Sequence, residues 1–164
     1  MFDVETTRLA MAVLEACRAR GATVATVESC TGGLVGGALT AIAGSSDVVL
    51  GGLITYSNDA KMALAAVPEA LLAAHGAVSE PVARAMAEGG RPALSATFAV
   101  AVTGVAGPGG GSAAKPVGLV HFACAGPAGT VHRERRFGPL SRDEIRRLSV
   151  LIALDMLREA APGT

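Results

Sequence analysis

The sequence predicts an α/β sandwich built on a mixed β-sheet. Segments with helical spacing alternate with short β-branched segments along most of the chain, which is typical of strands connected by helices. Residues 117–125 and 130–137 differ, because they form two strand-like segments joined by Gly126-Pro127-Ala128-Gly129, and such a hairpin is antiparallel. At 164 residues, 51% of them hydrophobic, the chain is long enough to bury the core that this sheet requires.

The first half of the chain predicts two strands among several helices. Leu9, Val13, Leu14 and Cys17 recur at near-helical spacing, and Gly21 is a plausible stop for this helix. The expected helices are residues 4–20, 33–42, 58–67 and 69–75, the last two separated at Pro68, and the expected strands are residues 23–27 and 48–56.

The second half predicts two further helices and a third strand before the hairpin. Ser79-Glu80-Pro81 begins a helix, because serine caps helices and proline fits the first turn. Residues 98–102 form the strand, and a glycine-rich segment follows it. The last helix begins near Ser141, which makes a capping box with Glu144, and ends before Pro162. Without a repeat or a linker, the chain predicts one domain over residues 1–164.

The net charge and the cysteine content argue against several classes of function and of structural site. The formal net charge is zero, which argues against a broad nucleic-acid or membrane surface, although arginines gather between residues 133 and 147 and could bind an anion. Cys17, Cys30 and Cys124 are odd in number and lack metal-ligand spacing, so they suggest neither disulfides nor zinc. With no charged leader and no long apolar run, we expect a soluble, cytoplasmic protein.

Reactive side chains follow three of the predicted strands. Ser29, Tyr56 and Thr103 all fall at strand ends. In sheets of this kind ligands bind beyond the carboxyl ends of the strands, so these positions predict a site. Tyr56, the only tyrosine, could hydrogen-bond a reacting group or stack on a flat ring, but it would also suit a core position.

Ser29 is a candidate nucleophile. It precedes a helix expected to begin near Thr31 or Gly32, whose free N–H groups could hold an oxyanion or a phosphate. The neighbouring Cys30 could compete with it, because helix N-termini depress thiol pKa values, although buried free cysteines are commoner. Glu28 could orient a lysine or a ribose hydroxyl, or simply cap backbone donors.

A serine nucleophile needs a base, and Lys61 is the better candidate. If Asn58 caps its helix, Lys61 lies in the first turn, where the helix dipole and burial would both lower the pKa of its ammonium. An exposed lysine is the commoner case, but the chain has only one other lysine, Lys115. His75, His121 and His132 occupy positions typical of packing or surface residues, so a Ser-His-Asp triad is weakly supported.

The segment Val102-Thr103-Gly104-Val105-Ala106-Gly107-Pro108-Gly109-Gly110-Gly111-Ser112 is a glycine-rich loop. Successive N–H groups in such a loop can form an anion-binding nest. The loop lacks the Gly-Lys-Ser/Thr ending of a Walker loop and does not match the Rossmann fingerprint. Taken alone, it would equally suit a mobile surface loop.

Five motifs occur in order along the chain: Glu28-Ser29-Cys30-Thr31-Gly32-Gly33, Thr55-Tyr56-Ser57-Asn58-x-x-Lys61, His75-Gly76-Ala77-Val78-Ser79, Gly104-Val105-Ala106-Gly107-Pro108 and Lys115-Pro116-Val117-Gly118. In these motifs the sequence resembles the CinA C-terminal domain family, the nicotinamide-nucleotide amidohydrolases. The resemblance extends over about residues 9–157.

The resemblance implies hydrolysis of the carboxamide of nicotinamide mononucleotide (NMN) to nicotinate mononucleotide and ammonia, in NAD salvage. It also implies a three-layer α/β/α fold with a mostly parallel sheet, no cofactor or metal, and a homo-oligomer, either dimer or trimer. Many family members carry an additional N-terminal pyrophosphatase-like domain, and this chain resembles the stand-alone form.

The resemblance also assigns roles. Ser29, Tyr56 and Lys61 correspond to the family's proposed catalytic residues, with Thr103 and an arginine of the last helix near the substrate. We choose Arg146 for that arginine; Arg142 and Arg147 are alternatives, because Gly138-Pro139-Leu140-Ser141 departs from the family's usual Gly-Asp-Arg run. The expected substrate-binding residues are Cys30, Thr31, Gly32, Gly33, Thr103, Gly104, Gly107 and Arg146.

Two other functions compete with amide hydrolysis. A non-catalytic nucleotide-binding or regulatory module would suit the glycine loop and the zero net charge, but it would not need a nucleophile beside a base. A role in DNA uptake or damage response is hinted at by the family's name, yet nothing in the sequence resembles a DNA-binding surface. Within the enzyme hypothesis, Ser29 either forms an acyl-enzyme or only binds substrate while Lys61 or Tyr56 activates water.

Overall fold

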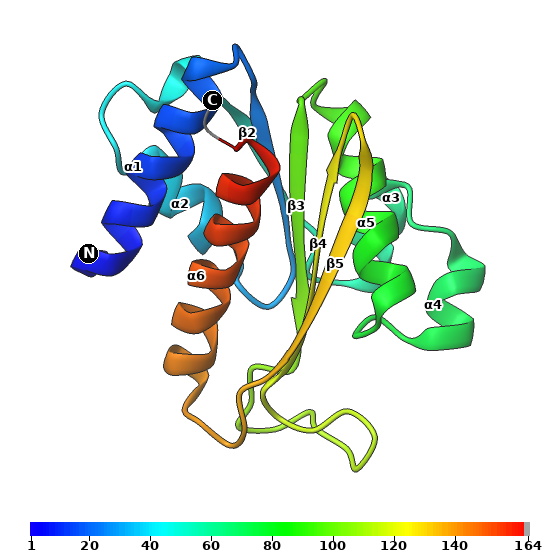
Figure 1. Cartoon of the computed structure of the whole chain (residues 1–164). Helices are drawn as coiled ribbons and strands as arrows, with labels where there is room; N and C mark the ends of the chain where they lie inside the picture. The colour runs from blue at the N-terminus through cyan, green and yellow to red at the C-terminus, as the bar shows by residue number, and fades with distance from the viewer. Residues whose placement is uncertain (163–164) are drawn as a thin grey trace.

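The computed structural model describes residues 1–162 and has three layers (Figure 1). A five-stranded sheet lies between two groups of helices, which confirms the predicted α/β/α sandwich. One group consists of α1 (Val4–Ala19), α2 (Leu34–Thr40) and α6 (Arg142–Ala160), and the other of α3 (Asn58–Ala65), α4 (Glu69–His75) and α5 (Glu80–Ala93).

The sheet is mixed, with its parallel part at the centre and one edge. Its strands are β1 (Val24–Glu28), β2 (Val49–Ile54), β3 (Phe98–Gly104), β4 (Leu119–Gly126) and β5 (Gly129–Arg136), in the order β2-β1-β3-β4-β5. β2, β1 and β3 run parallel, whereas β4 is antiparallel to both of its neighbours. The predicted hairpin is β4–β5, and the parallel strands end on one side, as the strand-end argument requires.

Small and β-branched residues let the helices approach the sheet closely. Every residue of β1 is buried, and β3 and β4 are buried except at their last residue, because helices cover both faces of these strands. Gly90 of α5 shows how close the layers are: a Cβ at this position would lie 2.2 Å from Val27 Cγ2 of β1. One core lies between the sheet and α1, α2 and α6, and a second lies between the sheet and α3 and α5.

Three helix starts follow from serine caps. The side chain of Ser79 accepts a hydrogen bond from Val82 N, and that of Ser141 accepts one from Glu144 N, as predicted. In α3 the cap is Ser57, which accepts from Ala60 N at 3.0 Å, so the assignment of the cap to Asn58 was wrong by one residue.

α2 begins within one residue of the predicted helix 33–42, but later than the start near Thr31 or Gly32 on which the expected anion site depended. The helix begins at Leu34, not near Thr31 or Gly32, because Gly32 (φ 57°) and Gly33 (φ 99°) adopt left-handed conformations that a helix cannot contain. Residues 29–33 therefore form an irregular turn between β1 and α2.

The carboxyl ends of the parallel strands meet the glycine-rich segment and the start of α6 at the lower end of the molecule in Figure 1. Within residues 1–162, every helix is too short or too polar to cross a lipid bilayer.

Candidate active site

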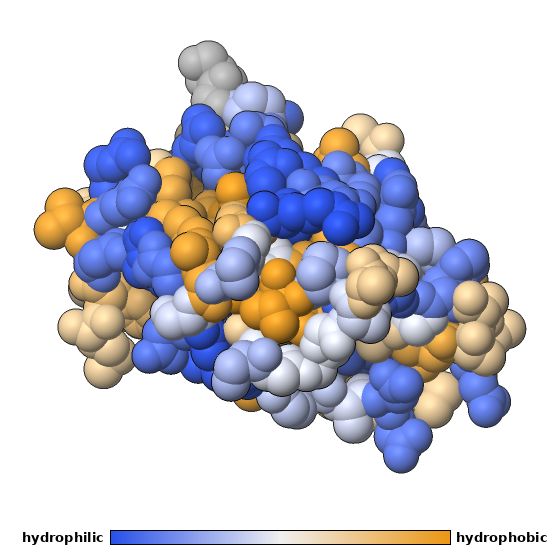
Figure 2. All heavy atoms as spheres, turned by 90° about the horizontal axis from the view of Figure 1, so that it is seen from below, coloured by the Kyte–Doolittle hydropathy of each residue, from blue (hydrophilic) through white to orange (hydrophobic). Residues whose placement is uncertain are grey.

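A cleft of about 230 Å³ opens at the carboxyl ends of β1, β2 and β3. Seen from this end, the molecule shows apolar surface near its centre with hydrophilic residues around it (Figure 2). Six residues of the predicted site line the cleft: Ser29, Cys30, Tyr56, Lys61, Thr103 and Gly104. Two larger hollows, of about 450 and 520 Å³, lie elsewhere and contain none of the predicted site residues.

Lys61 and Ser29 are in direct contact inside the cleft. Lys61 extends from α3 and is only 1% exposed, and its Nζ donates hydrogen bonds to Ser29 Oγ at 3.0 Å and to the carbonyl oxygen of Thr55 at 2.8 Å. Both partners are neutral, and within residues 1–162 Nζ forms no ion pair. Burial lowers the pKa of Lys61, since an ammonium loses its hydration here without gaining a carboxylate. The lysine is therefore suited to accept a proton from Ser29.

Backbone hydrogen bonds at the strand ends fix this contact. Ser29 N donates to the carbonyl of Val102 on β3 at 2.9 Å, and Thr55 N donates to the carbonyl of Glu28 at 2.8 Å. The serine thus follows β1 while it is tied to β3, and the residue that holds Nζ is tied to the end of β1.

The carboxylate of Glu28 occupies the N-terminus of α2. It is 1% exposed and accepts hydrogen bonds from Gly33 N at 3.0 Å, Val35 N at 3.0 Å and Gly36 N at 2.8 Å. The expectation that these N–H groups are free for an oxyanion or a phosphate is therefore wrong. Of the roles considered for Glu28, capping of backbone donors is the one observed.

Cys30 is a poor competitor for Ser29. It is buried beside the cleft, and burial raises the pKa of its thiol to about 11. The depression of the pKa expected from a helix N-terminus does not occur, because α2 begins four residues later and its first turn faces Glu28. At neutral pH the thiol is protonated, which leaves Ser29 as the candidate nucleophile.

Arg142 and Tyr56 meet at the rim of the cleft. Tyr56 is 61% exposed, so it is not a core residue, and its hydroxyl accepts a hydrogen bond from Arg142 Nη2 at 3.1 Å. Arg142 Nη1 donates to the carbonyl of Gly107 at 2.9 Å. Among the three candidate arginines of α6, Arg142 is the one that lines the cleft.

Arg146 and Arg147 point to other partners. Arg146 donates to the carbonyls of Cys30 at 3.1 Å and Thr31 at 3.3 Å, so it supports the turn after Ser29 from outside the cleft. Arg147 forms ion pairs with Asp3 and Glu144. The geometry therefore favours Arg142 over Arg146 for contact with a ligand.

Three other predicted binding residues, Thr31, Gly32 and Gly33, belong to that turn and do not line the cleft. Thr31 is fully buried, and a Cβ on Gly32 would lie 3.6 Å from Arg146 Nη2. These residues shape the backbone that carries Ser29, and their position does not bring them into direct contact with a ligand in the cleft.

Two hydrogen bonds join the glycine loop and the segment after it to the end of α4 and the chain between α4 and α5. Lys115 Nζ donates to the carbonyl of His75 at the end of α4, and Thr103 Oγ1 donates to the carbonyl of Ala77 at 2.9 Å. These contacts bring Ala77 and Val78 to the cleft wall, where sequence reasoning had assigned no role. Both residues belong to the motif His75-Gly76-Ala77-Val78-Ser79, which supports the resemblance. Its place among the motifs of the family could have indicated that they lie at the site.

Within residues 1–162, no histidine lines the cleft. His121 and His132 contact each other across the β4–β5 hairpin, with Nδ1 of the first 2.9 Å from Nε2 of the second. The described part of the cleft therefore holds no serine–histidine pair, and the two side chains in contact there are Ser29 and Lys61.

Comparison with known proteins places the chain in a family. The family model described as "CinA C-terminal domain" matches residues 6–161. The chain belongs to the CinA C-terminal domain family. A CinA-like protein of Synechococcus sp. (strain RCC307) is 60% identical over 158 residues, 96% of this chain and 38% of that protein. A CinA-like protein of Anaeromyxobacter dehalogenans (strain 2CP-C) is 54% identical over 142 residues, 87% of this chain and 35% of that protein. This CinA domain thus spans little more than a third of these relatives.

Solved structures of the family share the whole fold. Competence/damage inducible protein CihA from Agrobacterium tumefaciens superposes with a TM-score of 0.97 at 48% identity and covers 99% of each chain. The competence damage-inducible protein A (ComA) from Klebsiella pneumoniae gives a TM-score of 0.90 at 36% identity and covers 94% of this chain and 95% of its own. These names refer to competence and damage and state no reaction; membership of the family is compatible with an enzyme.

Proposed function

We propose that this CinA domain hydrolyses the carboxamide of NMN to nicotinate mononucleotide and ammonia. One observation carries the proposal: a buried lysine without a carboxylate partner lies 3.0 Å from a serine hydroxyl in a cleft at the strand ends. Burial of a lysine is costly for folding while the lysine is charged, but it favours the neutral amine that can act as a base toward the serine. A module that only bound nucleotides would have no need of this pair.

In the proposed reaction Lys61, as the neutral amine, takes the proton of Ser29 while Oγ forms a bond to the carboxamide carbon. The tetrahedral intermediate then loses its C–N bond, and Lys61 returns the proton to the departing nitrogen, which leaves as ammonia. Water attacks the resulting ester with Lys61 again as base, the bond to Oγ breaks, and Ser29 regains its proton as the carboxylate leaves.

The oxyanion requires hydrogen-bond donors other than the first turn of α2, since Glu28 occupies that turn. We assign this role to the N–H group of Cys30, which follows the nucleophile, lies at the cleft and donates to no carbonyl within residues 1–162. A donor of this kind is worth about 3 kcal/mol of transition-state stabilisation.

The size of the cleft suits the nicotinamide ring, with the ribose phosphate directed toward the rim. Arg142 uses two of its five N–H donors for Tyr56 and Gly107, so others remain for a phosphate. Tyr56 is exposed at the same rim and offers a ring face to the pyridinium.

The first test is release of ammonia from NMN by the purified protein in the presence of EDTA. We expect turnover by the wild type, and a loss of at least about a thousandfold in kcat for both Ser29→Ala and Lys61→Ala, because nucleophile and base act as a unit. Arg147→Ala, which changes a half-buried arginine of α6 that does not line the cleft, is the control and should retain activity.

Different outcomes separate the competing functions. Tight binding of NMN without ammonia release would favour a nucleotide-binding module. Retained activity in Ser29→Ala, without an acyl adduct by mass spectrometry, would assign the attack to water activated by Lys61 or Tyr56.

A further inference from the structure

The buried carboxylate of Glu28 has no role in the proposed chemistry, yet it lies directly behind the nucleophile. It is 1% exposed, forms no ion pair within residues 1–162, and is held by three backbone N–H groups of the turn and the first turn of α2. We infer that Glu28 is a positioning residue: its carboxylate fixes the turn 29–33 so that Ser29 Oγ lies within proton-transfer distance of Lys61. The inference rests on the proposed function.

The backbone of Glu28 is part of the same arrangement. Its carbonyl accepts a hydrogen bond from Thr55 N at 2.8 Å, and the carbonyl of Thr55 accepts one from Lys61 Nζ at 2.8 Å. Nζ in turn donates to Ser29 Oγ at 3.0 Å, and Ser29 is the next residue after Glu28. Glu28 therefore fixes the position of both reacting groups. Its side chain holds the turn that carries Ser29, and its carbonyl holds Thr55, which binds Nζ of Lys61.

The side chain must be a carboxylate for this purpose. Three N–H donors converge on two oxygens, Oε2 with two donors and Oε1 with one. A glutamine would supply one acceptor and turn its NH₂ group toward at least one of these donors, which would leave a buried N–H unsatisfied. A negative charge at a helix N-terminus is also favourable, which compensates for the burial of the carboxylate.

Glu28 acts on geometry and does not touch the substrate. Its carboxylate does not line the cleft, and the hydrogen bonds of Nζ go to Ser29 and Thr55. The turn has two glycines with positive φ and two backbone hydrogen bonds of its own, from Gly32 N to Ser29 O at 3.0 Å and from Leu34 N to Thr31 O at 3.1 Å. The carboxylate of Glu28 adds the three bonds that join the end of β1 to this turn and to the start of α2, so their loss lets the turn move. A displacement of about 1 Å of a reacting group can cost a hundredfold in rate.

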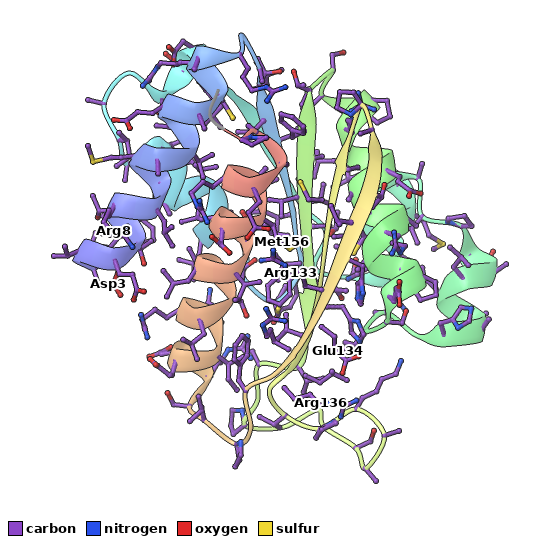
Figure 3. All side chains as sticks on the ribbon, in the orientation of Figure 1. Asp3, Arg8, Arg133, Glu134, Arg136 and Met156 are labelled. Carbon is purple, nitrogen blue, oxygen red and sulfur yellow. The ribbon has the colours of Figure 1, made fainter. Side chains whose placement is uncertain are left out.

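The test compares Glu28→Gln with Asp3→Asn. Both replace a carboxylate by an amide at a helix N-terminus, because Asp3 accepts from Thr6 N at the start of α1. Asp3 lies at the N-terminal end of α1, away from the strand-end loops (Figure 3). Two rates are measured: ammonia release from NMN, and labelling of Ser29 by phenylmethanesulfonyl fluoride. In the labelling step Oγ bonds to sulfur, fluoride leaves and Lys61 takes the proton, so this rate does not depend on NMN being the substrate.

We expect Glu28→Gln to lower kcat and the labelling rate about 30- to 100-fold per folded molecule, with KM within threefold and the midpoint of the pH dependence unchanged. Asp3→Asn should match the wild type in both rates. Equal rates in Glu28→Gln and wild type would overturn the inference, and so would a change confined to KM or a displaced pH midpoint.

A second variant tests the inference if Glu28→Gln does not fold. Gly36→Ala keeps the carboxylate and adds helix propensity, but its Cβ would lie 3.3 Å from Thr26 Oγ1 and 3.5 Å from Glu28 Oε1. It should slow labelling of Ser29 at least threefold in a fully folded protein, and an unchanged rate would count against the role of Glu28.

Labelling of wild-type Ser29 without turnover of NMN would reject the proposed substrate alone. Absence of labelling in the wild type would reject both ideas, since no activated serine would remain to be positioned.

Discussion

At the scale of single residues, Lys61 lowers the stability of the fold while it supplies the proposed base. It is the largest fully buried side chain of the described residues, and burial lowers its pKa from the ordinary value of 10.5. The unfolded chain therefore binds a proton more tightly than the folded one, and each unit of difference represents about 1.4 kcal/mol. The stability lost to this lysine at neutral pH is recovered as the pH rises through the lowered pKa toward 10.5.

Replacement of Lys61 by methionine should stabilise the protein while it abolishes activity. Methionine has a similar length and leaves no charge in the cleft, so the desolvation penalty disappears, and we expect the free energy of unfolding to rise by about 1 kcal/mol at pH 7. Urea unfolding at pH 7 and pH 9.5 measures this, and the gain should be smaller at the higher pH. A lower stability of Lys61→Met at pH 7 would show that the hydrogen bonds of Nζ outweigh its desolvation.

At the scale of elements, α6 distributes its arginines over different tasks. Arg142 and Arg146 are four residues apart and so lie on the same face of the helix, one turn from each other. The first reaches the rim of the cleft and the second the backbone of the turn after Ser29. One helix face thus contacts both the position that we propose for the phosphate and the turn that carries Ser29.

Removal of the Arg142 side chain should weaken the binding of NMN more than it slows the chemical step. We expect Arg142→Ala to raise KM for NMN about tenfold or more, because a phosphate loses a charged hydrogen-bond partner, with a smaller change in kcat. With nicotinamide riboside, which has no phosphate, the same substitution should have little effect. An equal loss for both compounds would show that Arg142 acts through Tyr56 and the loop and not through the phosphate.

The strand-end argument located most of the site from sequence, because parallel strands must end on one side of a sheet. It could not locate partners that depend on side-chain direction. Whether Arg142 or Arg146 faces the cleft depends on the rotation of α6, and a helical pattern leaves that choice open. For Glu28 the sequence offered capping of backbone donors beside two other roles and could not choose among them. Gly32 and Gly33 in succession were a usable signal that α2 starts late and leaves a turn in need of support.

At the scale of the whole molecule, the cleft requires all three layers. Ser29 comes from the sheet, Lys61 from the helices on one side and Arg142 from α6 on the other. The outer strand is also tied to α6, where Arg133 of β5 extends toward the helix and pairs with Asp155 at 3.1 Å (Figure 3). Loosening of either layer would separate the reacting groups, so activity should report on the cooperative stability of the fold.

That stability should depend on pH through the histidine pair of the hairpin. His121 is 7% exposed and stacks on His132, and burial lowers the pKa of both rings below the ordinary 6.5. Repulsion from His132 lowers the pKa of His121 further, while Glu80 partly opposes the shift in each ring. Because the folded state binds these protons less tightly than the unfolded chain, stability is full above pH 6.5 and falls as the pH drops below it.

We expect the free energy of unfolding to decrease by about 1 kcal/mol or more between pH 7.5 and pH 5.5. His132→Gln should reduce this decrease, because it leaves one ring without its repelling neighbour and removes the other titration altogether. His75→Gln, at the exposed end of α4, is the matched control and should retain the wild-type decrease. Urea unfolding curves at the two pH values measure the difference. The same decrease in His132→Gln and in the wild type would contradict the role of the histidine pair. Carboxylates such as Glu80 and Asp155, whose pKa values are lowered, should contribute only at lower pH.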